Sequence, residues 1–269
     1  SNTDLTRHLR LSLGGRLDAV STTSDAGVGP LSDTHAIVTP KVGLLYHLHR
    51  YADLYATVSR GFRQADGVIE DPSVGFITAW AYETGIKADV KGINADIALF
   101  RMDVSAEQPF DPVTLLPSAG GASRRQGIEL GLHARAGRWV LLHGSWTFND
   151  ARYLDFITPD GDTLTGRSVF NTSKYVGAVA ATVGPAAGNW SVTGSMNAVG
   201  PYAPFDEPGV ELPAYGLVHL SAYLRLRSVA LELGIRNLFD HKYPELRAGG
   251  FVSPGSPRTI YTTVRYRWS

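Results

Sequence analysis

His143 and Ser145 are two residues whose types and spacing could perform nucleophilic catalysis. Their side chains would point to the same face of an extended strand, because successive side chains alternate between the two faces. A histidine can activate a serine hydroxyl, but the site also needs a group that orients the base and donors for an oxyanion. Neither is visible in the neighbouring sequence, and this spacing is common on the polar face of a strand. We therefore expect no catalytic residue and no enzymatic activity.

His47 and His49 are the pair whose chemistry would suit a metal ion. Zinc takes three or four ligands, and no third ligand is evident nearby. The segment 160–162, Asp-Gly-Asp, lacks the spacing of a calcium-binding loop and is typical of a turn. Gly120-Gly121 is not followed by the Lys-Ser/Thr of a phosphate-binding loop. We expect no metal site and no cofactor.

The composition excludes several other classes of function. The 269 residues carry 25 basic and 25 acidic side chains, so no excess of positive charge favours a nucleic-acid partner. The absence of cysteine excludes disulfides, thiolate metal sites and a cysteine nucleophile. The chain contains no run of about 18 apolar residues, so the sequence predicts no transmembrane helix. No basic segment followed by an apolar run opens the chain, so we expect any signal peptide to have been removed.

The elements that would position these residues are β-strands, and the closing segment Pro257–Ser269 has the clearest pattern. Ile260, Val264 and Trp268 fall on one side of an extended chain, and Arg265 falls on the other. The first face could contact hydrocarbon and end in an aromatic girdle, while the second suits a wet interior.

The same alternation recurs along the chain and predicts about twelve strands. Their connections alternate between about 14–20 and about 2–6 residues, which is typical of outer-membrane barrels with long extracellular loops and short periplasmic turns. We therefore predict an all-β fold: an antiparallel up-and-down transmembrane β-barrel domain over residues 1–269. The predicted strands cover 9–19, 42–48, 54–58, 80–90, 93–104, 128–134, 140–148, 176–182, 190–198, 218–224, 229–235 and 260–268.

Two of these strands have ambiguous faces. In 93–104 the apolar positions change parity between Leu99 and Phe100, and we interpret this change as a β-bulge. In 176–182 both parities are apolar, and we assign the even-numbered residues from Val176 to Thr182 to the apolar face of the sheet.

The distribution of charge favours a membrane location over a soluble fold. A charged side chain on the lipid face costs about 2–4 kcal/mol near the bilayer midplane, and the middle stretches of the predicted apolar faces carry no Lys, Arg, Asp or Glu. A soluble β-sandwich binding module is one alternative to the membrane barrel. In such a module the apolar faces would form a dry core instead. The opposite faces carry Arg16, Lys41, Glu83, Lys87, Glu129, Arg135, Glu232, Arg236 and Arg265.

Seven phrases, in order along the chain, resemble the barrel of TonB-dependent outer-membrane receptors. The resemblance implies a bacterial outer-membrane location and TonB-powered uptake of a scarce nutrient such as a ferric siderophore or cobalamin. The phrases are Leu9–Asp18, Pro40–Leu44, Leu54–Arg63, Tyr82–Lys87, Gln126–Leu130, Arg236–Tyr243 and Pro257–Thr259.

The chain departs from the family pattern in two ways. Such receptors have barrels of about 22 strands filled by a plug, whereas this chain offers about half that number and shows neither a plug nor a TonB-contacting box. It therefore resembles the C-terminal part of a receptor barrel, and we expect contact with the TonB complex only if a plug lies upstream. The first alternative is a plug-less passive outer-membrane pore or structural barrel.

Ligand contacts in such a barrel are expected from the external loops and the lumen. Aromatic residues near strand ends, such as Trp80, Trp146 and Trp190, instead fit interfacial girdles against outer-membrane lipid. Tyr266 and Trp268 are expected to form a C-terminal signal for the barrel assembly machinery. The candidate residues for binding a small molecule are Arg63, Asp66, Tyr202, Phe205, Arg247 and Phe251.

Overall fold

The computed structural model describes residues 1–25, 30–64, 75–107, 121–157, 161, 163–185, 188–204, 210–248 and 251–268. These residues form strands, turns and isolated bridges, and none of them lies in a helix. Accordingly, the described part of the chain has no helix with the length and apolarity to cross a membrane.

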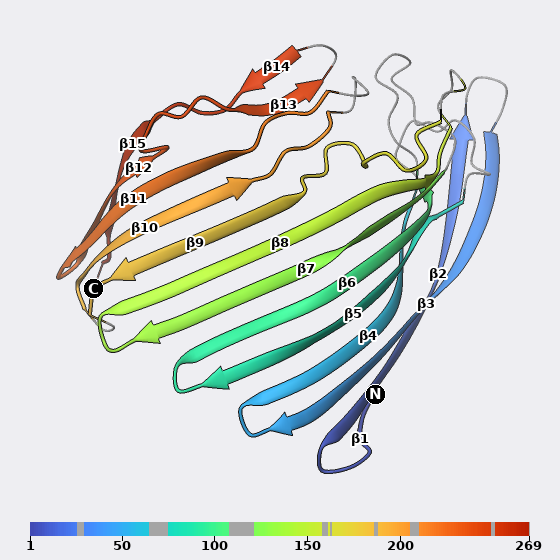
Figure 1. Cartoon of the computed structure of the whole chain (residues 1–269), viewed down its shortest axis with the longest axis horizontal. Coiled ribbons are helices and arrows are strands. Elements are labelled where there is room, and N and C mark those ends of the chain that lie inside the picture. The colour runs from blue at the N-terminus through green and yellow to red at the C-terminus, as the bar shows by residue number, and fades with distance from the viewer. Residues whose placement is uncertain are drawn as a thin grey trace. The chain divides into compact units, whose positions relative to one another are not determined.

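Within the described residues, thirteen strands form one sheet in the order β1 to β12 and then β15, and β13 pairs with β14 in a separate hairpin (Figure 1). All the predicted strands are present, and β1, β13 and β14 are additional short ones. The strands are β1 Asn2–Asp4, β2 Leu9–Asp25, β3 Pro30–His49, β4 Ala52–Arg63, β5 Ile77–Val90, β6 Ile93–Glu107, β7 Gly121–Ala136, β8 Val140–Asp155, β9 Tyr175–Val183, β10 Trp190–Val199, β11 Tyr215–Leu226, β12 Val229–Arg236, β13 Pro244–Ala248, β14 Phe251–Pro254 and β15 Thr259–Tyr266.

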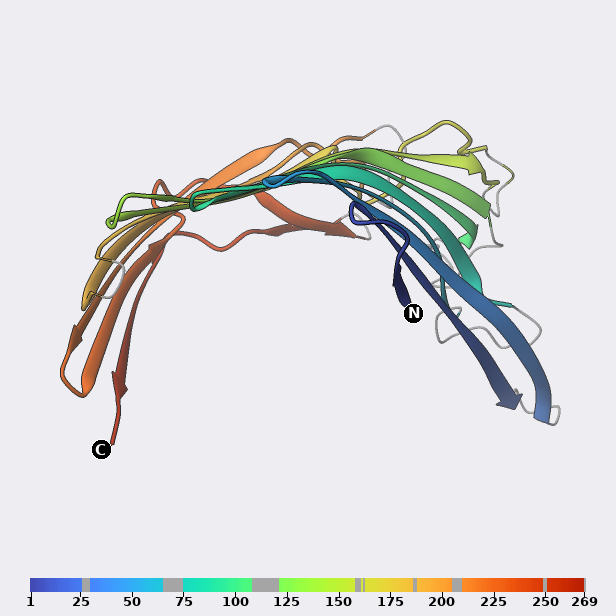
Figure 2. The same cartoon turned by 90° about the horizontal axis from the view of Figure 1, so that it is seen from below.

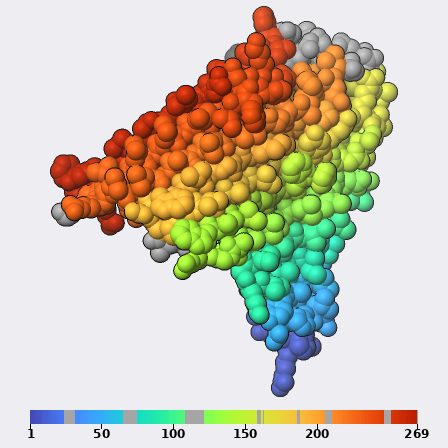
Figure 3. Space-filling view, turned by 60° about the vertical axis from the view of Figure 1, so that its left-hand side comes forward, coloured from blue at the N-terminus to red at the C-terminus, as the bar shows by residue number. Residues whose placement is uncertain are grey.

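The chain divides into two compact units. Unit 1 comprises Ser1–Ile86, Ala98–Gly127 and Asp150–Val169, and unit 2 comprises Lys87–Ile97, Ile128–Asn149 and Phe170–Ser269. Within unit 1, the long antiparallel pair β2–β3 stands out edge-on in Figure 2. Within unit 2, β9, β10, β11, β12 and β15 are successive neighbours in the sheet, and they form adjacent bands from yellow to red in Figure 3.

Short turns join the strands at one end of each hairpin. The β5–β6 turn is Lys91-Gly92, with φ of 45° and 88°. Positive φ at both central residues is the type I′ turn, whose twist matches that of paired strands, and glycine adopts it without steric cost. The predicted turn at 90–92 is thus confirmed.

The first predicted long loop is largely strand. β2 continues to Asp25 and β3 begins at Pro30, and the two pair without interruption from Leu9–Tyr46 to Asp25–Pro30. The added residues are rich in serine and threonine, which accept an extended backbone and need no apolar face. The alternation of hydrophobic residues predicted only the apolar part of this hairpin.

The register of unit 1 gathers apolar side chains on one face of its sheet. Leu13 lies opposite Val42, which lies opposite Val58. All three are exposed, so this face does not close over a dry core. We define the apolar face of unit 1 as the face that carries Leu13, Val42, Val58, Trp80, Tyr82 and Leu99.

Unit 2 has the same organisation. Leu224 lies opposite Leu231, which lies opposite Val264, and all three are exposed. A soluble sandwich would bury such a row between two sheets. Exposed rows of aliphatic side chains are instead the arrangement of a barrel that faces lipid.

The register corrects the predicted face of β9. Val179 and Val183 lie opposite Met196 and Val192 of β10, so the odd-numbered residues of β9 belong to the apolar face. Thr182 instead lies opposite Thr193, and their hydroxyls are 2.9 Å apart. The sequence-based assignment of the even-numbered residues was wrong, because both parities are apolar and only the neighbouring strand distinguishes them.

The predicted β-bulge between Leu99 and Phe100 is also wrong. Ala98 and Val104 have exposed fractions of 3% and 9%, whereas Leu99 between them is 54% exposed. Residues 98 and 104 share a face only when the alternation continues unbroken between them. Phe100 and Met102 therefore lie on the other face of the sheet from Leu99. The alternation of β6 continues without reversal between Leu99 and Phe100.

Candidate functional site

The long-loop end of unit 2 is organised by Asn237, which follows β12 with a positive φ of 50°. This residue is buried, and its backbone N–H donates to Nδ1 of His219 at 3.2 Å. Its amide nitrogen donates to the carbonyls of His241 at 2.9 Å and Ser256 at 3.1 Å. One side chain thus fixes both ends of the segment that carries β13 and β14.

Asp240 adds a second link between the same two chain segments. Its Oδ1 accepts a hydrogen bond of 2.7 Å from the backbone N–H of Arg258. This contact joins the phrase Arg236–Tyr243 to the phrase Pro257–Thr259, which are separate in the sequence. Both phrases are therefore parts of one structural junction.

A group of three tyrosines and one glutamate, here called the tyrosine cluster, lies beside this junction. It consists of Tyr202, Tyr215, Tyr243 and Glu245. The rings of Tyr215 and Tyr243 are 4.5 Å apart between centroids. Tyr202 is buried, forms an isolated bridge with Leu212, and donates its hydroxyl hydrogen to the backbone carbonyl of Glu245 at 3.3 Å.

Burial is the main cause that raises the pKa of Tyr202 and of Tyr215, and the negative charge of Glu245 acts in the same direction. Both phenols consequently stay protonated well beyond neutral pH. The cluster can therefore offer hydroxyl donors and aromatic ring faces to a ligand, and it does not supply phenolate charge.

The same end of unit 2 carries a charged pair and an exposed hairpin. Nζ of Lys174 lies 2.6 Å from Oε2 of Glu211. Phe251 of β14 is 81% exposed. The β13–β14 hairpin lies away from the β11–β12 turn in Figure 1. A bulky ligand at this end would meet an aromatic ring, a cation and a carboxylate.

The predicted binding residues are spread over both units of the chain. Tyr202 belongs to the tyrosine cluster, and Phe251 belongs to the hairpin that follows it. The backbone of Arg247 pairs with Val252 in this hairpin, while its side chain lies outside the described residues. Arg63 is exposed at the end of β4 in unit 1. Asp66 and Phe205 lie outside the described residues.

Sequence reasoning missed Tyr215, Tyr243 and Lys174. Tyr243 precedes Pro244, and Tyr215 follows closely after Pro213. Tyrosine next to a proline-containing loop was a usable signal. Their meeting depends on loops that join different strand pairs, and no local pattern encodes that proximity.

The end of β6 and the start of β7 in unit 1 hold a second polar group. Arg125 forms an ion pair of 2.5 Å with Glu107, and the fully buried Ser123 also hydrogen-bonds to Glu107. These contacts bind together the two strand ends that flank the segment 108–120. We interpret them as structural, since every charged member of the group has a partner.

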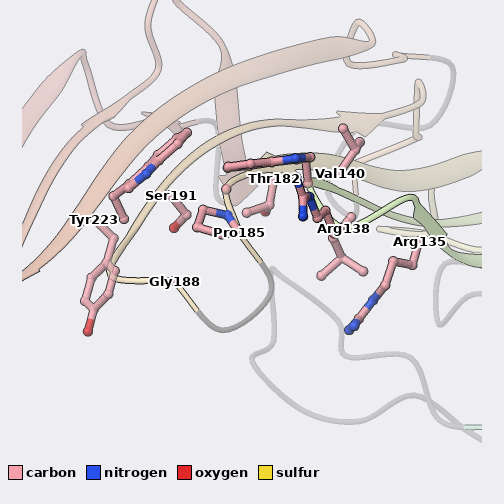
Figure 4. Close-up of a pocket in the computed structure, with 12 residues that line it drawn as sticks. Arg135, Arg138, Val140, Thr182, Pro185, Gly188, Ser191 and Tyr223 are labelled. Atoms are coloured by element: carbon pink, nitrogen blue, oxygen red, sulfur yellow. The ribbon is translucent and has the colours of Figure 1, made fainter.

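A pocket of about 250 Å³ lies at the short-turn end of unit 2. Figure 4 shows Tyr223 and Ser191 on one side and Arg135 and Arg138 on the other. The rings of Trp139 and Trp190 lie 6.2 Å apart beside it. The lining contains two guanidinium groups and no carboxylate, so it would favour an anionic group. The full lining is Arg135, Arg138, Trp139, Val140, Leu141, Thr182, Gly184, Pro185, Gly188, Trp190, Ser191 and Tyr223.

The two histidine pairs do not form catalytic or metal sites in the described part of the chain. The ring of His143 lies 6.3 Å from that of His133, between centroids, and no hydrogen bond joins it to Ser145 there. Nδ1 of His47 lies 2.7 Å from Oδ1 of Asp53, and the ring of His49 faces Tyr51. Among the described residues, no group of three His, Asp or Glu could hold a metal ion.

Comparison with known proteins identifies related sequences. The family described as "TonB dependent receptor-like, beta-barrel" matches residues 1–238. The chain is 29% identical over 252 residues to the metal-pseudopaline receptor CntO of Pseudomonas aeruginosa, covering 87% of this chain and 34% of that protein. It is 28% identical over 255 residues to the ferric-pyoverdine 358 receptor of Pseudomonas putida, covering 86% of this chain and 29% of that protein. The chain spans about a third of the length of these relatives.

Solved structures show the same fold. The ferric yersiniabactin uptake receptor FyuA of Yersinia pestis matches with a TM-score of 0.80 at 18% identity, over 98% of this chain and 44% of that protein. The ferric-catecholate import receptor Fiu of E. coli K12 matches with a TM-score of 0.78 at 20% identity, over 98% of this chain and 43% of that protein. At these identities the likeness establishes the strand arrangement alone.

Proposed function

Because this chain belongs to the TonB-dependent receptor-like β-barrel family, we propose that it forms part of the wall of a receptor that takes up a metal chelate. The family resides in the bacterial outer membrane, and its members are receptors and transporters, not enzymes. The family match over residues 1–238 carries the proposal. The names of two relatives, a metal-pseudopaline receptor and a ferric-pyoverdine receptor, support a ferric siderophore or similar chelate over cobalamin.

We place ligand contact at the long-loop end of unit 2. The tyrosine cluster supplies ring faces and protonated hydroxyls, and Phe251 stands exposed on β14 of the hairpin that follows Tyr243. Metal chelates of this class are bulky and rich in oxygen atoms, so they suit hydroxyl donors and aromatic contacts. Arg63, Asp66, Phe205 and Arg247 remain proposed contacts on the strength of their place in or beside the long loops.

Two partners belong to the same proposal. Energised uptake would require a plug that contacts the TonB complex, supplied by the intact protein. Tyr266 and Trp268 would act as the signal for the barrel assembly machinery. Their rings lie 5.0 Å apart in an edge-to-face arrangement near the end of the chain.

Ligand binding can be tested on the intact protein with two matched exposed phenylalanines. Phe251 is 81% exposed and Phe239 is 74% exposed, so neither supports the fold through burial. Phe251→Ala should weaken binding of a ferric siderophore about 10-fold, the size expected from losing one aromatic contact of about 1.4 kcal/mol. Phe239→Ala should leave the affinity unchanged.

The readout is quenching of intrinsic fluorescence by ferric siderophores of the catecholate, hydroxamate and carboxylate classes. Cobalamin and the iron-free siderophores serve as comparisons. Binding of none of these ligands, combined with a steady ionic conductance in planar bilayers that is independent of TonB protein, would support the passive-pore alternative instead. Equal losses in both phenylalanine variants would contradict the placement of the ligand at β14.

A further inference from the structure

Three arginines lie on the apolar face of unit 1, beyond its aliphatic residues. Arg60 has the parity of Val58 along β4, and Arg101 has the parity of Leu99 along β6. Arg124 of β7 reaches the same face, because its Nε lies 2.6 Å from Oδ1 of Asp103, a residue of the same parity as Arg101. Charged groups at these positions lie above the apolar band and not within it.

Aromatic side chains mark the level of these arginines. The guanidinium carbon of Arg60 lies 5.9 Å from the ring centroid of Trp80. Arg101 lies within electrostatic range of the Tyr82 hydroxyl. Tryptophan and tyrosine gather where a membrane changes from hydrocarbon to headgroups, since their rings are apolar at one end and polar at the other. The arginines are therefore at headgroup depth.

Asp103 only partly neutralises the group. Its carboxylate accepts hydrogen bonds from Arg101 and Arg124, at 2.8 Å and 2.6 Å. Burial by itself would raise the pKa of Asp103, but these hydrogen bonds and charges outweigh it and lower the pKa, so the carboxylate is ionised at neutral pH. Three guanidinium groups and one carboxylate leave two positive charges at this place.

Several donors of these arginines are not used by the protein. Nε of Arg60 is buried and has no hydrogen-bond partner. The side chain of Arg101 is exposed and that of Arg124 is half-buried, and each bonds Asp103 with only part of its guanidinium. Each guanidinium carries five N–H donors in a planar fork, which matches the oxygen atoms of a phosphate group.

We propose that Arg60, Arg101 and Arg124 bind the phosphate group of an anionic membrane lipid whose acyl chains lie against the apolar face of unit 1. The apolar face below the arginines provides the surface for the chains, and the excess of two charges provides the attraction for the headgroup. The proposal rests on the outer-membrane location of the family and is independent of the ligand proposed above.

The experiment uses the intact protein in mild detergent, mixed with micelles of phosphatidylglycerol or phosphatidylcholine. Lipid that stays bound is counted by native mass spectrometry. The wild type should retain phosphatidylglycerol at least about 10-fold more than phosphatidylcholine, because only the former carries net negative charge. In the double variant Arg101→Gln and Arg124→Gln, retention of phosphatidylglycerol should fall to that of phosphatidylcholine.

Two further variants separate lipid binding from a structural role. Arg16→Gln removes an exposed arginine on the opposite face and should change nothing. Asp103→Asn removes the internal counter-charge and should raise retention of phosphatidylglycerol about 2-fold or more. If these residues formed only a structural ion-pair group, Asp103→Asn should instead lower the retention of phosphatidylglycerol. Heat-modifiable migration on a gel verifies that each variant is folded.

Two results would overturn the proposal. The first is equal retention of phosphatidylglycerol by the wild type and the double variant. The second is complete displacement of the lipid by millimolar inorganic phosphate, which would identify a site for soluble anions. Retention that resists inorganic phosphate and depends on Arg101 and Arg124 supports the lipid site.

Discussion

Substitution of Leu233 by arginine tests whether the apolar face of unit 2 contacts hydrocarbon. Leu233 of β12 is 50% exposed and lies opposite Ala222 and Thr262. It follows Val229, the first residue of β12, by four positions, or about 13 Å along the strand. Strands of such barrels tilt by about 35–45°, so Leu233 lies about 10 Å above Val229, near the middle of an apolar band about 25 Å tall.

The expected cost follows from this depth. Arginine on the lipid face destabilises a barrel by about 2–4 kcal/mol near the midplane and by about 0–1 kcal/mol near the interface. Leu233→Arg should therefore lower the equilibrium constant for folding by about 30-fold to about 1,000-fold. Leu226→Arg is the matched control, because Leu226 is on the same face but at the β11–β12 turn.

The measurement is a reversible guanidinium titration of the intact protein in lipid vesicles, followed by tryptophan fluorescence. Exposed positions in a water-soluble protein tolerate such changes to within about 0.5 kcal/mol. A cost of that size for Leu233→Arg would refute the lipid-facing assignment. Equal, larger costs for Leu233→Arg and Leu226→Arg would refute the argument from depth.

Three further predictions concern single side chains. Asn237→Ala should lower the free energy of unfolding by about 2–3 kcal/mol in a denaturant titration, because it removes three side-chain hydrogen bonds of a buried residue, to the carbonyls of His241 and Ser256 and from the N–H of His241; Ser228→Ala, in the exposed β11–β12 turn, should leave the stability unchanged. Gly234→Ala should force the Tyr261 ring away, since an added Cβ would lie 2.2 Å from it; a loss of about 1–3 kcal/mol and altered near-ultraviolet circular dichroism are expected, and an unchanged spectrum would contradict this contact. Asp103 should stabilise the protein above its unfolded pKa of about 3.9 and lose this effect as pH falls through its lower folded value. Because the pair is partly exposed, Asp103→Asn should cost at most about 1 kcal/mol at pH 7 and nothing at pH 2, and a cost that persists in acid would exclude the ion pair as its cause.

The twelve longer strands and their faces could be predicted from the sequence wherever one parity was apolar and the other polar. Along β12, for example, Leu231 and Leu233 alternate with Glu232 and Gly234, so the faces follow from chain geometry alone. The same reasoning failed in β9, where Val179 and Ala180 are both apolar. It also failed in β6, where hydrophobic residues fill the face opposite to Leu99 beyond the apolar band.

The candidate site was predictable only in part. Tyr202 and Phe251 were chosen for their place in proline- and glycine-rich loops, and both lie at the long-loop end of unit 2. Tyr215 and Tyr243 were missed because they are 28 positions apart in the sequence and meet through their rings. Asn237 lies in a phrase that resembles the family, but its burial and its hydrogen bonds with His219, His241 and Ser256 appeared only in the fold.

The sequence by itself determined that apolar, lipid-facing side chains alternate with polar, water-facing side chains along antiparallel strands, because that alternation is a local property of an extended backbone. The tertiary structure alone decided the face of β9, the tyrosine cluster and the grouping of Arg60, Arg101 and Arg124. Each of these depends on which residue of a neighbouring strand or loop lies opposite, and that register joins positions far apart in the chain.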